Sequence, residues 1–215
     1  MDRRTSEEKF ESYIESKLNN NGYTSVSHTE YNKEDCILPH HLVSFIKSSQ
    51  PEKWEKLEEQ YGDQTNEKVL SRISTEISKR GLIDCLREGV KDRGEYLDLV
   101  YFKPKSSLNP DHQELFRKNT FQVVRQLHYS EKKTHNSIDM VLFLNGIPLL
   151  TMELKNQLSG QGDREGKLQY KYDRNPKGEP LLQFKRCLVH FCVDNDKVNM
   201  TTKLDGKDTF FLPYN

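Results

Sequence analysis

Apolar residues recur with a helical period in the first part of the chain. Phe10, Ile14 and Leu18 lie four positions apart with a glycine after them, a pattern that predicts a helix over residues 5–20. The stretch 35–89 shows a similar period and is predicted to be a helical insert. Three helices are expected in it, marked by Leu42, Phe45 and Ile46, by Trp54 and Leu57 after Pro51, and by Val69, Leu70, Ile73 and Ile77 before Gly81.

The period shortens to that of β-strands after residue 95. Asn145-Gly146 lies between two apolar runs in residues 137–156, which is a strong signal for a β-hairpin. A helix is expected from Gly166 to Arg174, since Asn175-Pro176 would end it. Further strands are predicted over 96–102, 120–128, 187–193 (buried on both faces), 198–202 and 209–212.

The order of these elements predicts an α/β fold in which helices flank a mixed sheet. We expect one domain over residues 1–215, with a core formed by 5–34 and 90–215. The composition is compatible with such a core, because 10% of the residues are aromatic although 31% are charged and the mean hydropathy is −0.88.

Composition also limits the cellular setting. No run approaches the length of about 18 apolar residues that a transmembrane helix needs, and the N-terminus lacks the apolar stretch of a secretory signal. The four scattered cysteines do not suggest a disulfide framework. We therefore predict a protein of the reducing cytoplasm with no membrane partner.

Charge excludes one class of nucleic-acid binder. The 33 basic and 33 acidic residues cancel, so bulk charge does not hold this chain to nucleic acid as it holds a histone. A local basic run lies between Arg164 and Arg186, with seven basic residues against three acidic ones. This run is either a contact surface for phosphates or an ordinary solvated face.

Three charged residues lie near the ends of the predicted hairpin strands. Asp139 is near the start of the first strand, and Glu153 and Lys155 are near the end of the second, two positions apart and hence on one face. Two carboxylates and a lysine at one end of a sheet suit phosphodiester hydrolysis, because the carboxylates hold Mg²⁺ and the lysine orients water or stabilises charge on the phosphate. From spacing alone, ordinary strand-end charges explain the pattern equally well.

The hairpin also sets a question of register. A two-residue turn at Asn145-Gly146 would place Asp139 opposite Met152 and on the face away from Glu153. One metal ion does not easily use carboxylates on opposite faces. We therefore predict an odd-numbered loop with a bulge, such as Asn145 to Ile147, or else a bend in the strand at Asp139.

An Asp, a hairpin and Glu-x-Lys form the pattern of PD-(D/E)-x-K nucleases. The whole phrase from Asn136 to Asn156 closely resembles the N-terminal nuclease region of the restriction (R) subunit of type I restriction–modification enzymes. Ser6 to Glu11 fits the same family. Further stretches that resemble it are Gln169 to Pro176, Phe184 to Phe191, Met200 to Thr202 and Phe211 to Asn215.

The resemblance implies roles for individual residues. It makes Asp139 and Glu153 metal-binding carboxylates, with the backbone carbonyl of Leu154 as a further ligand, and it makes Lys155 the catalytic lysine. Glu11 resembles the glutamate of the first helix that many relatives place near the metal. Gln169 resembles the glutamine of a Gln-x-x-x-Tyr motif that helps to hold metal or DNA, and Lys167, Lys171 and Arg174 are expected to contact DNA.

Two positions depart from the family pattern. Ile138 stands where the motif has proline, a position that often varies. Asp173 stands where the Gln-x-x-x-Tyr motif has tyrosine, so the role of that tyrosine does not transfer to this chain.

The resemblance implies a restriction-endonuclease-like core and a function. The chain would be the endonuclease domain of a type I R subunit that cuts double-stranded DNA with Mg²⁺, or Mn²⁺ as a substitute, after ATP-driven translocation stalls. ATP would act only through a helicase motor that follows this domain, and the partners would be the specificity (S) and methyltransferase (M) subunits. The alternatives are a stand-alone repair or junction nuclease, and a DNA-binding or docking module with a vestigial site.

Overall fold

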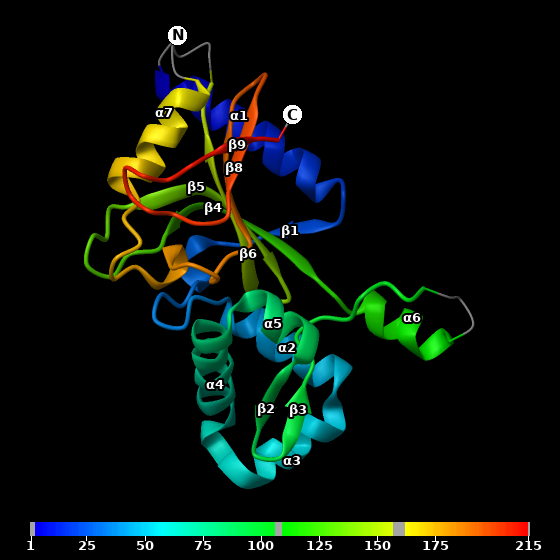
Figure 1. Ribbon diagram of the computed structural model, residues 1–215. Coiled ribbons are helices and arrows are strands. Elements are labelled where there is room, and N and C mark those ends of the chain that lie inside the picture. Colours follow the sequence, from blue (N-terminus) through cyan, green and yellow to red (C-terminus); the bar gives the residue numbers. More distant parts are fainter. Residues whose placement is uncertain (1–2, 106–108, 157–161, 215) are drawn as a thin grey trace.

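The centre of the computed structural model is a mixed β-sheet (Figure 1). The structure describes residues 3–105, 109–156 and 162–214, and within them this sheet has seven strands in the order β1-β4-β5-β6-β7-β8-β9. β1 runs parallel to β4 and β6 runs parallel to β7, while the other neighbours are antiparallel. The strands are β1 (Tyr23–Ser25), β4 (Phe121–His128), β5 (Ser137–Leu144), β6 (Ile147–Leu154), β7 (Val189–Val193), β8 (Val198–Thr201) and β9 (Leu212–Pro213).

Helices cover the two faces of this sheet. Helix α1 (Arg3–Asn19) places its apolar stripe, Phe10 and Ile14 included, against Met140 and Leu142 on one face. On the other face, α7 (Asp163–Leu168) continues into the single π-helical turn η4 (Gln169–Asp173). Both predicted helices are therefore confirmed, although the second begins earlier and ends in a wider turn.

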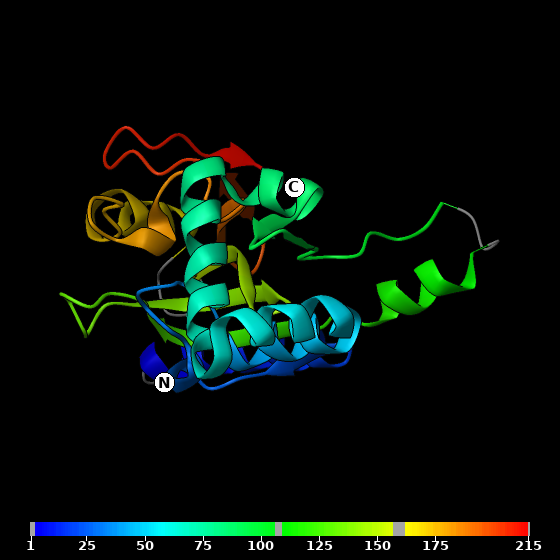
Figure 2. The same ribbon diagram turned by 90° about the horizontal axis from the view of Figure 1, so that it is seen from below.

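The helical insert forms its own core below the sheet (Figures 1 and 2). Its apolar stripes pack together because α2, α3 and α4 each bury the residues that the period of three to four predicts. The predicted helices correspond to α2 (Pro39–Ser49), α3 (Pro51–Tyr61) and α4 (Thr65–Arg80), with the short turns η1 (His28–Glu30) and η2 (Gly62–Gln64) before α2 and α4.

Several short elements differ from the sequence prediction. The predicted strand 96–102 shrinks to β3 (Glu95–Leu97), which pairs only with β2 (Val90–Asp92) in a small separate hairpin. The predicted strand 209–212 is reduced to β9. Strand β7 is not buried on both faces, because its odd positions are half-exposed. The sequence analysis missed α5 (Leu82–Glu88), α6 (Pro110–Arg117) and the short turn η5 (Pro180–Leu182).

The turn between β5 and β6 is the point where the helical insert meets the sheet. Asn145 and Gly146 both have positive φ, 53° and 82°, as a two-residue hairpin turn requires. The Asn145 side chain accepts a hydrogen bond from Thr120 N and donates one to Leu99 O. The carbonyl of Gly146 accepts a hydrogen bond of 2.8 Å from Leu38 N, just before α2. The turn thus holds the insert through backbone contacts.

Two further findings concern the state of the cysteines and the length of the helices. All four cysteines are buried and free. No helix within the described residues is long and apolar enough to cross a membrane.

This turn gives a test of the fold. A Cβ at Gly146 would lie 2.6 Å from Leu38 O and 2.8 Å from Leu42 N, both backbone atoms, whereas a Cβ at Gly94 meets nothing within 4 Å. Both glycines have positive φ, so each alanine substitution pays about 1–2 kcal/mol for its backbone conformation. In urea unfolding, Gly146→Ala should lose clearly more stability than Gly94→Ala. Equal losses would contradict the close packing at the turn.

Candidate active site

The β5–β6 hairpin brings the two predicted carboxylates close together. Its loop is the two-residue turn, so the predicted odd-numbered loop is wrong. The register instead shifts inside the strands, because Phe143 pairs with Pro148 but Leu142 pairs with Leu150. The extra residue on β6 is a bulge, and from there Met140 pairs with Met152. The ladder of pairs ends there, one position before Asp139 and Glu153, and the two carboxylates are close enough for Asp139 to raise the pKa of Glu153.

Strand β5 is also distorted at Asp139, the other possibility that the sequence left open. Ile138 and Val141 pack in the same hydrophobic cluster, although residues three apart in a regular strand point to opposite faces. The neighbouring strand β4 is distorted at the same level, where Gln126 has a φ of 46°. The side-chain alternation of both strands is therefore interrupted beside Asp139.

Backbone and side-chain donors converge on the Asp139 carboxylate. The amide of Leu154 donates a hydrogen bond of 2.8 Å to Oδ2, and Nζ of Lys155 lies 3.8 Å from the same oxygen. Lys155 follows β6 directly and is only 8% exposed. The structure therefore brings Asp139, Glu153 and Lys155 together, as the sequence pattern predicts.

Glu153 is a fully buried carboxylate with one free oxygen. Its exposed fraction is 0%, and Oε1 accepts a 2.7 Å hydrogen bond from Nε of Arg174. Oε2 is buried and has no hydrogen-bond partner among the described residues. Burial raises the pKa of Glu153 well above its usual range and the neighbouring Asp139 raises it further, while Arg174 and Lys155 oppose the shift. An orphaned buried carboxylate oxygen beside a second carboxylate is a favourable place for a cation.

Arg174 requires a correction to the sequence analysis. We expected it to contact DNA, but it is only 7% exposed and its guanidinium forms the buried ion pair with Glu153. The pairing is physically reasonable because a buried carboxylate without a partner is strongly destabilising.

Glu11 lies close to the carboxylates, and both of its own carboxylate oxygens accept hydrogen bonds from neighbouring side chains. It is 5% exposed, its Oε2 accepts hydrogen bonds from Nε and Nη2 of Arg125, and its Oε1 accepts one from Gln126. Burial raises the pKa of Glu11, and the nearby Asp139 carboxylate raises it further. Position and electrostatics thus place Glu11 at the edge of the site.

The turn after α7 covers the site from the other face of the sheet. This helix lies against Cys192 and Lys155, since a Cβ at Gly166 would be in ordinary contact with them at 3.4 and 3.6 Å. Gln169 is half-buried at the first position of the π-helical turn. The next residue, Tyr170, is buried and its hydroxyl contacts Thr151 Oγ1 at 2.6 Å. Single π-helical turns are frequent at functional sites.

The predicted basic run separates into buried and accessible parts. Arg186 is buried and bonds Ser74 and the carbonyl of Cys36, so it holds the helical insert instead of facing solvent. Lys167 pairs with Asp163 at 2.7 Å. Lys177 and Lys185 are exposed, and a hollow of about 330 Å³ beside α7 is lined by residues that include Arg164, Lys167, Lys171, Phe210 and Phe211.

The donor set limits how a metal ion would be held. No group of three or more Asp, Glu, His or Cys within the described residues is arranged as a metal site. A metal at this position would therefore use the two carboxylates and the carbonyl of Leu154, with water or substrate for the remaining positions. Mg²⁺ is commonly bound in this way, through one or two carboxylates and several waters.

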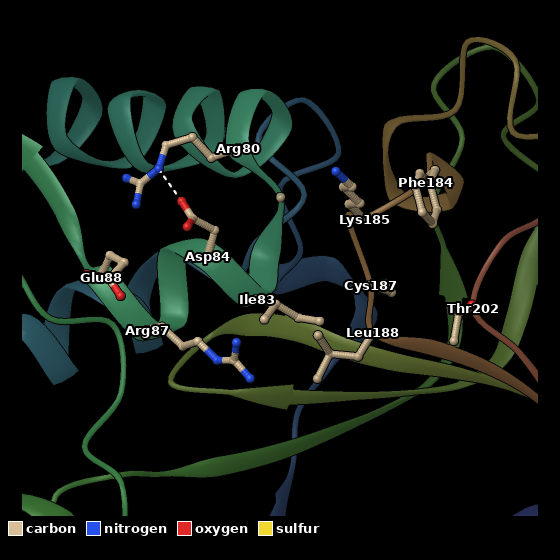
Figure 3. A pocket seen from close by; sticks show the side chains of 11 residues that line it. Arg80, Ile83, Asp84, Arg87, Glu88, Phe184, Lys185, Cys187, Leu188 and Thr202 are labelled. Carbon is tan, nitrogen blue, oxygen red and sulfur yellow. Dashed lines mark hydrogen bonds and ion pairs between the residues drawn. The ribbon is translucent and has the colours of Figure 1, made fainter.

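A further cavity lies away from these residues. It has a volume of about 560 Å³ and lies between α5 and the chain that leads into β7 (Figure 3). Ile83 and Leu188 line it from opposite sides, and Arg87 and Lys185 lie at its edge. None of its lining residues belongs to the carboxylate site.

Comparison with known families agrees with this geometry. Residues 4–209 match the family model of the type I restriction enzyme R protein N terminus. The chain belongs to this family. It corresponds to the N-terminal nuclease region of a type I R subunit, and the mixed sheet flanked by helices is consistent with the restriction-endonuclease-like fold. The comparison with curated proteins gave no match.

The buried carboxylate of this nuclease region predicts a pH effect. Because the pKa of Glu153 is higher in the folded than in the unfolded state, its protonation contributes stability at low pH that is lost as pH rises from near 4.5 through the folded pKa. Glu153→Gln lacks this titration. In chelator, urea unfolding from roughly pH 5 to pH 8 should show the parent losing stability relative to Glu153→Gln.

A matched control separates this effect from general charge. Glu114→Gln removes an exposed carboxylate on α6 and should show no such pH-dependent difference from the parent. A stability difference, parent minus Glu153→Gln, that stays constant or increases as pH rises would contradict the raised pKa.

Proposed function

We propose that this R-subunit region hydrolyses phosphodiester bonds of double-stranded DNA in a reaction that depends on Mg²⁺, with Mn²⁺ as a substitute. The observation that carries the proposal is the convergence of Asp139, buried Glu153 and Lys155 at one end of the β5–β6 hairpin. Two carboxylates and a lysine are costly in a buried place unless they serve a ligand.

The residues present fit a divalent cation. Asp139, Oε2 of Glu153 and the carbonyl of Leu154 would hold it, since Oε2 is buried without a partner. A bound Mg²⁺ would polarise the phosphate and lower the pKa of a coordinated water. The negative charge of the two carboxylates would attract such an ion.

The remaining residues set the geometry of the carboxylates and the lysine. Arg174 occupies Oε1 of Glu153 and so leaves Oε2 as the oxygen that faces the site. Lys155 lies near Asp139, where its ammonium can donate to a phosphate oxygen or to the attacking water. Gln169, on the π-helical turn, is proposed to support substrate or metal binding from the adjacent helix.

DNA would reach this site through the accessible basic side chains beside it. Arg164, Lys167 and Lys171 lie on α7 and the turn that follows, which also covers Lys155. Because the whole chain is neutral, we propose that the nuclease region depends on its complex to hold DNA. That complex comprises the S and M subunits and an ATP-driven motor on the R subunit, and cleavage follows stalled translocation in the cytoplasm.

The catalytic assignment predicts a specific pattern of loss. In the full complex, Asp139→Ala, Glu153→Ala and Lys155→Ala should each reduce cleavage by about three orders of magnitude or more, and the triple variant should be little worse, because residues that act as a unit are not additive. ATP hydrolysis should persist. DNA cleavage and ATPase rates measured together provide the test.

Controls make this result interpretable. Glu114→Ala, an exposed carboxylate on α6, should cut normally. Normal cleavage by Lys155→Ala or Asp139→Ala would show that the hairpin is not the active site, and a docking module with a vestigial site would replace the proposal.

The charge distribution predicts weak DNA binding by the chain alone. Affinity should fall steeply with salt, and Lys171→Ala should reduce the slope of log K against log salt by about 1 if the lysine contacts one phosphate. Lys68→Ala, an exposed lysine on α4, is the matched control and should leave the slope unchanged. Tight, sequence-specific and salt-insensitive binding would refute this account.

A further inference from the structure

Gln126 is the most unusual residue next to the carboxylates. It lies inside β4 with a φ of 46°, a left-handed conformation that residues with a side chain rarely adopt in a strand. The ladder to β5 pairs Arg125 with Met140 and Leu127 with Ile138, so the distortion falls at the level of Asp139. Strained backbone of this kind persists only where surrounding contacts hold it, and it concentrates at functional sites.

The side chain of Gln126 makes three hydrogen bonds around the site. Its Nε2 donates to Oε1 of Glu11 at 2.8 Å and to Oδ1 of Asp139 at 3.2 Å. Its Oε1 accepts from Oγ of Ser137 at 2.8 Å. Ionised carboxylates only accept hydrogen bonds, so the amide nitrogen must face them and the orientation of the amide is determined.

These contacts fix the Asp139 carboxylate by both oxygens. Gln126 holds Oδ1, and the backbone amide of Leu154 holds Oδ2. Glu11 accepts hydrogen bonds from Arg125 on Oε2 and from Gln126 on Oε1, so the same amide nitrogen bridges Glu11 and Asp139. The contact from helix α1 to Asp139 therefore passes through the amide of Gln126.

We infer that Gln126 is a positioning residue of the nuclease site, and that Glu11 acts on Asp139 through it and not as a direct metal ligand. This inference rests on the proposed function. Gln126 orients Asp139 toward Glu153 and links that orientation to α1. Partners that orient metal ligands commonly change metal affinity 10- to 100-fold when they are removed.

Substitution by glycine separates the side chain from the backbone. Glycine adopts positive φ without strain, so Gln126→Gly keeps the backbone conformation and removes the side chain with its amide. Titration calorimetry of the 215-residue chain with Mn²⁺ should show affinity about 10- to 100-fold weaker than the parent. The melting temperature in chelator should change little. Arg93→Gly, at a second residue with positive φ (48°) in the β2–β3 turn, should leave Mn²⁺ affinity unchanged.

A double-mutant cycle tests the role of Glu11. If it acts through Gln126, Glu11→Gln should weaken Mn²⁺ binding in the parent but not further in the Gln126→Gly variant. If Glu11 is a direct ligand, the loss should be equal in both backgrounds, and this part of the inference is overturned.

The outcomes distinguish this inference from the proposed function. Parent-like Mn²⁺ affinity in Gln126→Gly, with loss of binding in Asp139→Asn, would overturn the positioning role alone. Absence of Mn²⁺ binding by the parent chain would overturn the metal-dependent function and the inference with it. A Gln126→Gly variant that melts far below the parent would show that the amide holds the fold, and this too would overturn a specific positioning role.

Discussion

The burial of two carboxylates at one point of the sheet is the constraint on which the site depends. Glu153 is fully buried beside Asp139, and both its burial and the neighbouring carboxylate raise the pKa of Glu153. Such a pair is tolerated only when positive charge and hydrogen-bond donors surround it. Arg174 and Lys155 supply the positive charge, and the backbone amide of Leu154 supplies a donor.

This constraint accounts for irregularities in the elements around it. A regular two-residue hairpin would pair Asp139 with Met152, and the bulge in β6 shifts that register by one residue toward Glu153. The π-helical turn after α7 delivers Arg174 to Glu153, and β4 is distorted at Gln126 beside Asp139. Each feature departs from regular geometry where the carboxylates need a neighbour.

The hairpin separates two tasks along its length. Its turn, at Asn145 and Gly146, binds the helical insert, whereas the carboxylates lie at the opposite end of the same two strands. The insert buries its own core against residues near the turn, such as Ile147, and stays clear of the site. The arrangement leaves the site end bordered by α7 and α1 (Figure 1).

Much of this arrangement could be predicted from the sequence because its signals are local. The apolar period located α1 and α2 to α4, and Asn-Gly between apolar runs located the hairpin. The position of the bulge could not be predicted, since it depends on how β6 packs between its neighbours. The role of Arg174 was missed because a basic residue in a charged run resembles a surface residue until its buried partner is known.

The predictions for the short elements were wrong for a related reason. Residues 98–102 read as strand, but they find no partner strand, and pairing is decided by tertiary structure. Gln126 carried no sequence signal, because glutamine is not a residue that favours positive φ. Its conformation follows from contacts with Glu11 and Asp139, which are 115 and 13 positions away.

The most direct test of the central claim is the position of a bound ion. Crystals of the chain soaked in Mn²⁺ would reveal it by anomalous scattering. The account predicts a peak at about 2.0–2.6 Å from a carboxylate oxygen of Asp139, Oε2 of Glu153 and the carbonyl of Leu154, the range of oxygen–metal distances for divalent ions. A peak elsewhere, or none at this position under saturating Mn²⁺, would contradict the claim that the buried carboxylates form a metal site.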